Sequence, residues 1–400
     1  MQISDLMSPN FFSDPYPVYD QMREAGSLVA LGPGTWMTGS YAVVDALLRD
    51  RRAGKKYMER VTSVYGEEAV KGELFEANAN TLLQMNPPVH SRLRRLLAKA
   101  FNAYQVKSFT ATAESVADRL IDELTPKGEG DILEKYAYAL PLEIICDMMD
   151  IPPSDGPMLS RAGQVATRSV EPELMTPADI EEGNRAISHF QSYFNDLVRK
   201  RRLQPGSDLI SVLLSTEDEG ESLTDAEIFS NVLLLFLAGH ETTANMISNA
   251  IIALHDHPEM IARAIADESL WPAIVSECMR YDNSIQVTVR ALMEDVDIDG
   301  HQLKKGDTIY LYLGAANRDP SIFDQPNRLA LDRTEKAVSS MSFGAGAHFC
   351  LGARLAAIEL EVALRKLATR LPDFELTNAT SLQWRRRSVV RGVTSLRARW

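Results

Sequence analysis

The segment FGAGAHFCLGARLA, residues 343–356, places a cysteine in a glycine-rich loop directly before a segment of helical character. Because glycine lacks a Cβ, Gly344 and Gly346 allow backbone conformations that bring the chain close to a flat ligand. A helix that begins just beyond Cys350 would stabilise a thiolate with its free N–H groups and dipole. Such a thiolate is a suitable axial ligand for haem iron. Taken alone, the loop also fits a small buried cysteine at a turn.

A second candidate segment is AGHETT, residues 238–243, within the most apolar part of the chain. A glycine followed by polar residues in such a stretch needs a reason. A threonine hydroxyl can bond to a carbonyl one turn earlier and open a helix locally. The small Ala238 and Gly239 directly precede these polar residues. The alternative interpretation is a polar interruption of an ordinary core helix.

Two further pairs have helical spacing. SECMR places Glu277 and Arg280 on one helix face within ion-pair reach, although exposed Glu–Arg pairs are common and contribute little. HSRLR places His90 and Arg94 one turn apart on a basic amphipathic helix. Either pair, taken alone, also fits an ordinary solvated surface.

The spacing of the whole cysteine loop is far more specific than its parts. From Phe343 to Glu359 the chain fits F-G-x-G-x-H-x-C-x-G-x-x-L-A-x-x-E, which closely resembles the haem-binding loop of the cytochromes P450. The resemblance implies haem b with the thiolate of Cys350 as its axial metal ligand. The positions that match haem-contacting residues of the family are His90, Arg94, Ala238, Gly239, Arg290, Phe343, Gly344, His348, Cys350 and Gly352. The basic members of this set are expected to hold the two propionates.

The resemblance assigns roles to the other motifs and spans nearly the whole chain. Glu241 and Thr242 match the acid–alcohol pair that relays protons in the family. Glu277 and Arg280 match a buried structural network that Arg333 completes. The family's usual Phe-Asp before this arginine is replaced by Leu329-Ala330.

The elements that must position these residues are mainly helical. Apolar periodicity and capping signals predict helices over residues 17–25, 41–49, 90–100, 111–149, 177–202, 225–255 and 352–370. Extended segments are expected at 27–31 and 35–39, and short strands with turns at DG and KG follow Arg280. Without repeats or linkers, residues 1–400 are expected to form a single domain that is mostly α with small β-sheets. The resemblance adds the cytochrome P450 fold, a triangular prism with the haem between the long central helix and the helix after the cysteine loop.

Composition bounds the class of protein. A hydrophobic content of 45% and a charged content of 24% are those of an ordinary globular protein, and a net charge of −13 argues against nucleic-acid binding. Three widely spaced cysteines favour a reducing compartment, so we expect a cytoplasmic protein. No secretory signal is visible, and the most apolar run is shorter than the roughly 20 residues that span a bilayer, so no membrane anchor is expected. We expect a monomer.

The resemblance implies a haem-thiolate monooxygenase that inserts one oxygen atom from O2 into a hydrophobic small molecule by hydroxylation or epoxidation. Polyketide, terpenoid and fatty-acyl compounds of secondary metabolism are the expected substrates. The chain has no room for a fused flavin domain, so electrons are expected from NAD(P)H through a ferredoxin or flavodoxin and its reductase. By position, the substrate pocket is expected to be lined by Leu82, Leu83, Leu234, Ile285, Val287, Val289, Val389 and Val390.

Two other functions are compatible with a haem-thiolate site, and two basic segments suggest partners. A peroxygenase or isomerase needs no external electrons, and a haem-based gas sensor needs no proton relay, so the Glu241–Thr242 pair disfavours both. A basic docking face for an acidic redox partner is predicted from Arg92, Arg95, Lys99 and Arg354. RRAGKK, residues 51–56, is interpreted as solvated surface, with an acidic carrier protein as the alternative partner.

Overall fold

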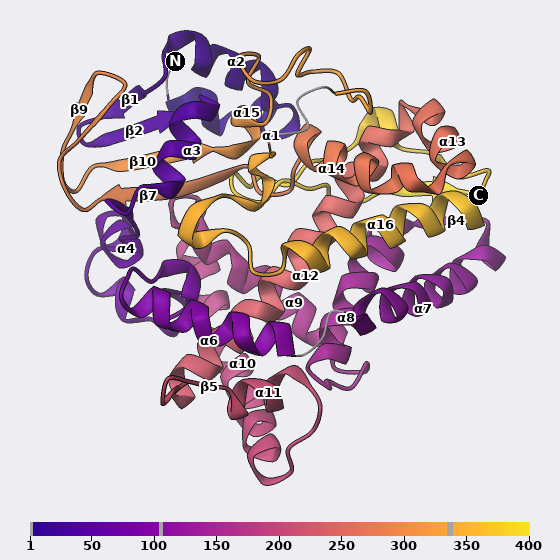
Figure 1. Ribbon diagram of the computed structural model, residues 1–400, viewed down its shortest axis with the longest axis horizontal. Coiled ribbons are helices and arrows are strands. Elements are labelled where there is room, and N and C mark those ends of the chain that lie inside the picture. The colour runs from indigo at the N-terminus through magenta and orange to yellow at the C-terminus, as the bar shows by residue number, and fades with distance from the viewer. Residues whose placement is uncertain (1–2, 104–106, 334–338) are drawn as a thin grey trace. The chain divides into compact units, whose positions relative to one another are not determined.

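The computed structural model describes residues 3–103, 107–333 and 339–400 (Figure 1). The chain divides into two compact units. The first unit comprises Met1–Gly54, Ala113–Leu140 and Thr242–Trp400, and the second comprises Lys55–Thr112 and Pro141–Glu241. Because both units consist of segments distant in sequence, no linker separates them along the chain. The expectation of a single domain stays a prediction.

The first unit is built around a five-stranded sheet of order β1-β2-β10-β7-β3. Its strands, in chain order, are β1 (Val29–Gly32), β2 (Thr35–Thr38), β3 (Ala53–Gly54), β7 (Val287–Leu292) and β10 (Thr308–Tyr312). Strand β10 runs parallel to β2, and the other neighbouring strands are antiparallel. The sheet therefore joins the amino-terminal hairpin to the strands predicted after Arg280.

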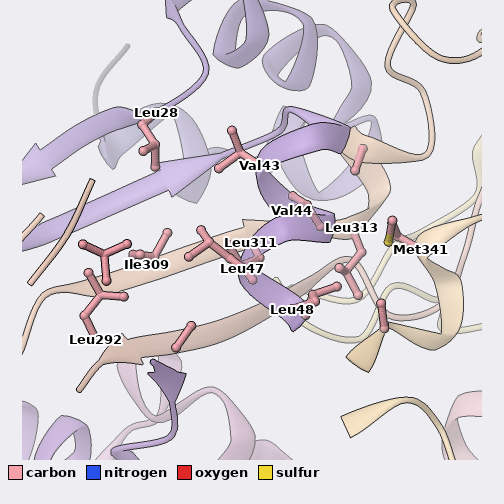
Figure 2. Close-up of a cluster of buried hydrophobic side chains, with 14 of the residues drawn as sticks. Leu28, Val43, Val44, Leu47, Leu48, Leu292, Ile309, Leu311, Leu313 and Met341 are labelled. Atoms are coloured by element: carbon pink, nitrogen blue, oxygen red, sulfur yellow. The ribbon is translucent and has the colours of Figure 1, made fainter. Parts of the chain in front are cut away.

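Helix α3 (Tyr41–Arg49) packs on this sheet, and the cysteine loop contacts the same cluster of buried apolar side chains. Figure 2 shows apolar side chains of α3 meeting those of β7 and β10, with Met341 at the edge of the cluster. Met341 and Ala345, which lie at the start of the cysteine loop, are buried in this cluster. Each fully buried side chain of this kind stabilises the fold by about 1.5–3 kcal/mol. The loop is therefore anchored on a rigid core.

Helices make up most of the remaining structure. The first unit contains α1 (Pro9–Ser13), α2 (Tyr16–Ala25), α3, α13 (Pro258–Ala266), α14 (Trp271–Tyr281), α15 (Leu313–Ala316) and α16 (Ala353–Arg370). The second unit contains α4 (Tyr57–Tyr65), α5 (Glu73–Ala79), α6 (Val89–Ala103), α9 (Gly156–Ala166), α10 (Pro177–Leu203) and α11 (Leu209–Ser215). Helices with residues in both units are α7 (Lys107–Leu124), α8 (Ala139–Met148) and α12 (Asp225–His255).

The remaining strands are short. The first unit has a three-stranded sheet of β11 (Glu375–Leu376), β12 (Arg397–Arg399) and β4 (Glu129–Asp131), and a hairpin of β8 (Val296–Ile298) and β9 (His301–Leu303). The second unit has a hairpin of β5 (Glu217–Asp218) and β6 (Glu221–Ser222). Asp299-Gly300, with both residues at positive φ, forms the turn between β8 and β9 that the DG signal predicts.

The long helix α12 begins and ends as predicted. Thr224 Oγ1 accepts a hydrogen bond from the Glu227 amide at 3.3 Å, and the Glu227 carboxylate accepts one from the Thr224 amide at 2.9 Å. This reciprocal pair is a capping box that satisfies two free amides at the helix start. In the second unit, α12 packs its Phe236 against Phe190 and Phe194 of α10, and all three rings are fully buried.

The helix predicted over residues 111–149 is present at both ends of this range but is interrupted in the middle. Helix α7 ends at Leu124, strand β4 follows, and a π-helical turn, Leu133–Tyr138, precedes α8. Pro126 and Gly128, the latter at φ 68°, interrupt the helix. The segment then pairs with β12 from the other end of the chain, a contact that apolar periodicity does not reveal. None of the helices among the described residues is long and apolar enough to cross a membrane.

Candidate active site

The cysteine loop is a compact turn held by its own backbone. The Cys350 amide donates a hydrogen bond to the Phe343 carbonyl oxygen at 3.0 Å, and the Phe349 amide donates one to the Gly346 carbonyl oxygen at 3.1 Å. Helix α16 begins at Ala353, with Gly352 as its N-cap. The half-buried Cys350 thus lies just before the amino-terminal end of an 18-residue helix, where free amides favour a thiolate.

Two glycines give this loop its shape, for different reasons. Gly344 and Gly346 both have φ of +67°, a region that residues with a Cβ rarely adopt. A Cβ on Gly346 would also lie 2.3 Å from the Leu48 carbonyl oxygen and 3.0 Å from Arg49 Cα. Both of these are backbone atoms of the anchored helix α3, so the neighbour cannot move away. The loop therefore crosses the end of α3 at a distance that only glycine permits.

Alanine substitutions at the three glycines of the loop are expected to differ sharply. Gly346→Ala meets both the collision and the positive φ, so we expect more destabilisation than the approximately 1–3 kcal/mol of backbone strain alone. A Cβ on Gly344 would have its nearest contact at 3.9 Å, so Gly344→Ala is expected to be destabilised by the backbone strain alone. Gly352→Ala has no atom within 4 Å of its Cβ and no positive φ, and serves as the matched control. Urea denaturation midpoints measure the order; equal midpoints for all three variants would contradict it.

Arg290 is a buried cation whose environment suits an anionic ligand group. It lies in β7 with 2% of its surface exposed, and its Nη1 donates to Thr288 Oγ1 at 3.4 Å and to the Val289 carbonyl oxygen at 3.2 Å. Burial lowers the pKa of Arg290 to about 10, with no carboxylate of the described residues offsetting this shift. Burying a charge without a counter-charge is costly. A haem propionate would supply that counter-charge, so the residue present fits the predicted cofactor.

The other basic residues predicted to hold propionates lie in both units. His348, in a 3₁₀ turn (Gly346–His348), belongs to the first unit with Arg290. His90 and Arg94 lie one turn apart on α6 of the second unit, and His90 is only 2% exposed. Their shared role as propionate ligands stays a prediction.

The acid of the predicted proton relay is buried and bonded. Glu241, on α12, is 3% exposed, and its Oε2 accepts a hydrogen bond from the Thr167 hydroxyl. The neighbouring Thr242 is half-buried. The backbone is helical at every residue of α12, including Ala238–Thr243, so the expected local opening of the helix is not present. Sequence reasoning missed Thr167, which lies 74 positions from Glu241 along the chain.

The three residues of the predicted structural network lie together in the first unit. Arg280 donates from Nε and Nη2 to the two carboxylate oxygens of Glu277, each at 2.8 Å, and Arg333 Nε donates to Glu277 Oε1 at 2.8 Å. The Ala330 amide donates a fourth bond to the same carboxylate at 2.9 Å. Leu329-Ala330 therefore leaves the network intact, since the bond comes from the backbone.

The predicted pocket residues fall into two groups, one in each unit. In the first unit, Ile285 forms a β-bridge with Val390, and the Gln286 amide donates to the Val389 carbonyl oxygen at 2.9 Å, so these two chain segments are adjacent. Val287 is buried in a core cluster, while Val289 is half-buried. In the second unit, the Leu82 amide donates to Asn231 of α12 at 3.0 Å. Of the other two pocket candidates in this unit, Leu83 is exposed and Leu234 is half-buried.

The predicted basic docking face is largely neutralised by the protein itself. On α6, Arg92 pairs with Glu227, Arg95 with Asp218, and Lys99 Nζ lies 3.0 Å from an Asp218 oxygen. Carboxylates of the β5–β6 hairpin and of the start of α12 therefore offset much of the positive charge of the predicted face, although the side chains of Arg95 and Lys99 remain 42% and 53% exposed. Docking of a redox partner on this face stays a prediction. Arg354 is exposed, as expected.

Two further features of the sequence are the basic segment RRAGKK and Glu359 of the loop motif. Of RRAGKK, only Arg51 and Arg52 are exposed, while Ala53 and Gly54 are buried in edge strand β3 and Lys55 and Lys56 are half-buried. The interpretation as solvated surface therefore holds for the two arginines only, because strand pairing with β7 buries the residues that follow. Glu359 of α16, noted only as part of the loop motif, is 2% exposed, and burial raises its pKa well above the ordinary value.

Comparison with known proteins defines the class. The sequence model of the family Cytochrome P450 matches residues 174–381. A Xylella fastidiosa (strain 9a5c) protein provisionally named cytochrome P450 133B2 is 46% identical over 396 residues, covering 99% of this chain and 98% of that protein. The biotin biosynthesis cytochrome P450 of Bacillus subtilis is 33% identical over 96% of this chain and 95% of its own. The solved structure of P450BioI in complex with a hexadec-9Z-enoic acid-ligated acyl carrier protein is 30% identical, with a TM-score of 0.89 over 98% of this chain and 100% of that one.

A loop that holds a cysteine before a helix, together with this structural match, defines a haem-thiolate enzyme. The chain belongs to the cytochrome P450 family, whose members are monooxygenases that carry haem with a thiolate ligand. The structural match confirms the predicted fold class, mostly α with small β-sheets.

Proposed function

We propose that this protein inserts one oxygen atom from O2 into a C–H bond or a double bond of a hydrophobic, fatty-acyl or polyketide-like molecule. We propose that electrons reach it from NAD(P)H through a ferredoxin or flavodoxin. The observation that carries the proposal is the Cys350 loop, anchored on the α3–sheet core and followed directly by α16. When bound, thiolate-ligated haem supplies the oxygen activation.

In this proposal the protein's own residues would hold the haem and deliver protons. Cys350 holds the iron as a thiolate, and Arg290 supplies the buried positive charge for a propionate. Glu241 and Thr242 deliver protons from the long helix, because a carboxyl and a hydroxyl can each donate and accept a proton. His348, His90 and Arg94 add positive charge or hydrogen bonds to the propionates.

The substrate class rests on the lining residues and on relatives. The predicted pocket residues are all aliphatic, which suits a hydrophobic substrate. The solved complex of P450BioI with an acyl carrier protein that carries hexadec-9Z-enoic acid supports a fatty-acyl chain. The proposed substrate is therefore either a free fatty acid or an acyl chain bound to a carrier protein. Titration of each form, monitored by the haem spin-state shift, identifies the form that binds more tightly.

Product yield per electron tests the proposed function against a peroxygenase. With a ferredoxin, its reductase and NADPH, we expect wild-type protein to form product in proportion to the NADPH consumed, and hydrogen peroxide alone to support much slower turnover. Thr242→Ala is expected to keep haem and NADPH consumption but to divert most electrons to peroxide, since general acid catalysis contributes about 10²–10⁴-fold. Thr242→Ser keeps the hydroxyl and is the control.

Either of two outcomes would contradict this account. Equal or faster turnover with peroxide alone would favour a peroxygenase. Unchanged coupling of NADPH to product in Thr242→Ala would remove the relay role of the hydroxyl.

A further inference from the structure

The carboxyl of Glu241 has a specific partner in the second unit. Thr167 is the C-cap of helix α9 and the first residue of a 3₁₀ turn (Thr167–Val170). Its Oγ1 lies within hydrogen-bond reach of Glu241 Oε2, and it lies 3.2 Å from the Gln164 carbonyl oxygen. A threonine hydroxyl has one proton to donate. A carboxylate is the stronger acceptor of the two because bonds to charged groups are stronger than neutral ones. The hydroxyl proton therefore points to Glu241.

The turn that carries Thr167 is itself fixed. The Tyr57 hydroxyl donates to the Ser169 carbonyl oxygen at 2.7 Å, and Asn78 Nδ2 donates to Ser169 Oγ at 3.3 Å. Arg60 Nη2 donates to the Val170 carbonyl oxygen at 2.9 Å. Tyr57 and Ser169 are both buried. Helices α4 and α5 thus hold the turn with three side-chain hydrogen bonds, so the segment that carries Thr167 is fixed independently of Glu241.

The same part of the chain contacts α12 at the preceding residue as well. Ser160 Oγ of α9 lies 3.3 Å from His240 Nε2, and both side chains are buried. Two consecutive side chains of α12 are therefore tied to α9 and the turn that follows it. The Ser160–His240 contact fixes the helix, while the Thr167 contact reaches the acid itself.

We propose that Thr167 is a positioning residue of the proton relay, whose hydroxyl orients the Glu241 carboxyl. This inference rests on the proposed function, in which Glu241 delivers protons. A hydrogen bond from Thr167 limits the rotation of the carboxyl, because the bond is retained in only a narrow range of side-chain torsions.

Substitution at Thr167 separates this role from packing. Thr167→Val keeps the shape of the side chain and removes the hydroxyl, whereas Thr167→Ser keeps the hydroxyl. Ser160→Ala is the matched control, since it removes the neighbouring contact to His240 and leaves Glu241 bonded. If Thr167→Val does not fold or load haem, Thr167→Ala removes the hydroxyl with less crowding. Melting temperature and haem content are measured for every variant.

Two readouts test the role, and one does not depend on turnover. Infrared difference spectra locate the carboxyl stretching band of Glu241, identified by its loss in Glu241→Gln. We expect Thr167→Val to shift this band to that of a carboxyl with one hydrogen bond fewer, and Thr167→Ser and Ser160→Ala to leave it in place. In turnover, Thr167→Val is expected to raise the ratio of peroxide to product about tenfold, which is the lower end of the effect of losing a hydrogen bond to a charged group. The solvent isotope effect on turnover is also expected to change.

The outcomes distinguish failure of the inference from failure of the proposed function. An unshifted band and unchanged coupling in Thr167→Val, with Glu241→Gln strongly uncoupled, would overturn the role of Thr167 and leave the relay standing. Full coupling in Glu241→Gln would overturn the relay and, with it, the positioning role. Equal uncoupling in Thr167→Val and Thr167→Ser would also overturn the inference, because packing rather than the hydroxyl would then matter.

Discussion

Cys350→Ser is expected to remove the thiolate-type spectrum of the reduced carbon-monoxide complex and to lower monooxygenase turnover by more than about 100-fold. In metal sites in general, loss of a residue that only supports a ligand lowers metal affinity or activity about 10–100-fold. Loss of the ligand itself should cost more. A serine hydroxyl is far less acidic than a thiol and donates less electron density, so it cannot replace the sulfur in promoting O–O cleavage.

The two other cysteines provide the control for this experiment. Cys146 and Cys278 are buried, and burial raises the pKa of the Cys146 thiol to about 12 and that of Cys278 further still. Both are therefore neutral thiols at pH 7. Cys146→Ala and Cys278→Ala are expected to keep the wild-type spectrum. A thiolate-type spectrum that survives Cys350→Ser, or disappears in either control, would assign the ligand elsewhere.

Glu277→Ala is expected to destabilise the protein by about 3–5 kcal/mol, the range for breaking a buried ion pair. The side chains of Glu277 and Arg280 are 6% and 3% exposed, so the substitution leaves Arg280 as a buried cation without its carboxylate. Arg333, at 13% exposed, loses its bond to the same group. The Ala330 amide, in a buried position, also loses its acceptor. The substitution thus removes the acceptor of four hydrogen bonds.

An exposed ion pair in the same region is the matched control. Arg328 and Asp332 are 3.1 Å apart with side chains 50% and 68% exposed. Asp332→Ala is expected to cost less than about 1 kcal/mol, as solvent-exposed pairs do. Chemical denaturation of both variants measures the difference. A loss below about 1 kcal/mol in Glu277→Ala would show that this network does not stabilise the fold.

The sequence allowed prediction of those elements whose signals are local. Helix 41–49 agrees with α3 at both ends, and helix 225–255 agrees with α12, because apolar periodicity and the Thr224 cap both lie within the segment itself. The loop motif placed Cys350 before a helix for the same reason, since its glycines and the helix start lie within one short stretch.

Features that depend on distant partners could not be predicted. The chain from Leu124 to Ala139 leaves the helix to pair with a strand more than two hundred residues later, a contact without a local signal. The positive charges of Arg95 and Lys99 suggested an open docking face, but the acidic hairpin that pairs with them is remote in sequence. Thr167 is an ordinary threonine until folding brings it to Glu241.

The spectrum of the reduced carbon-monoxide complex of freshly prepared wild-type protein tests the central claim most directly. The protein is expected to give the band of a thiolate-ligated haem, because Cys350 lies in a preformed loop whose following helix favours the ionised sulfur. An imidazole-type band in the intact protein would contradict the account, since it would show that a histidine, and not Cys350, holds the iron.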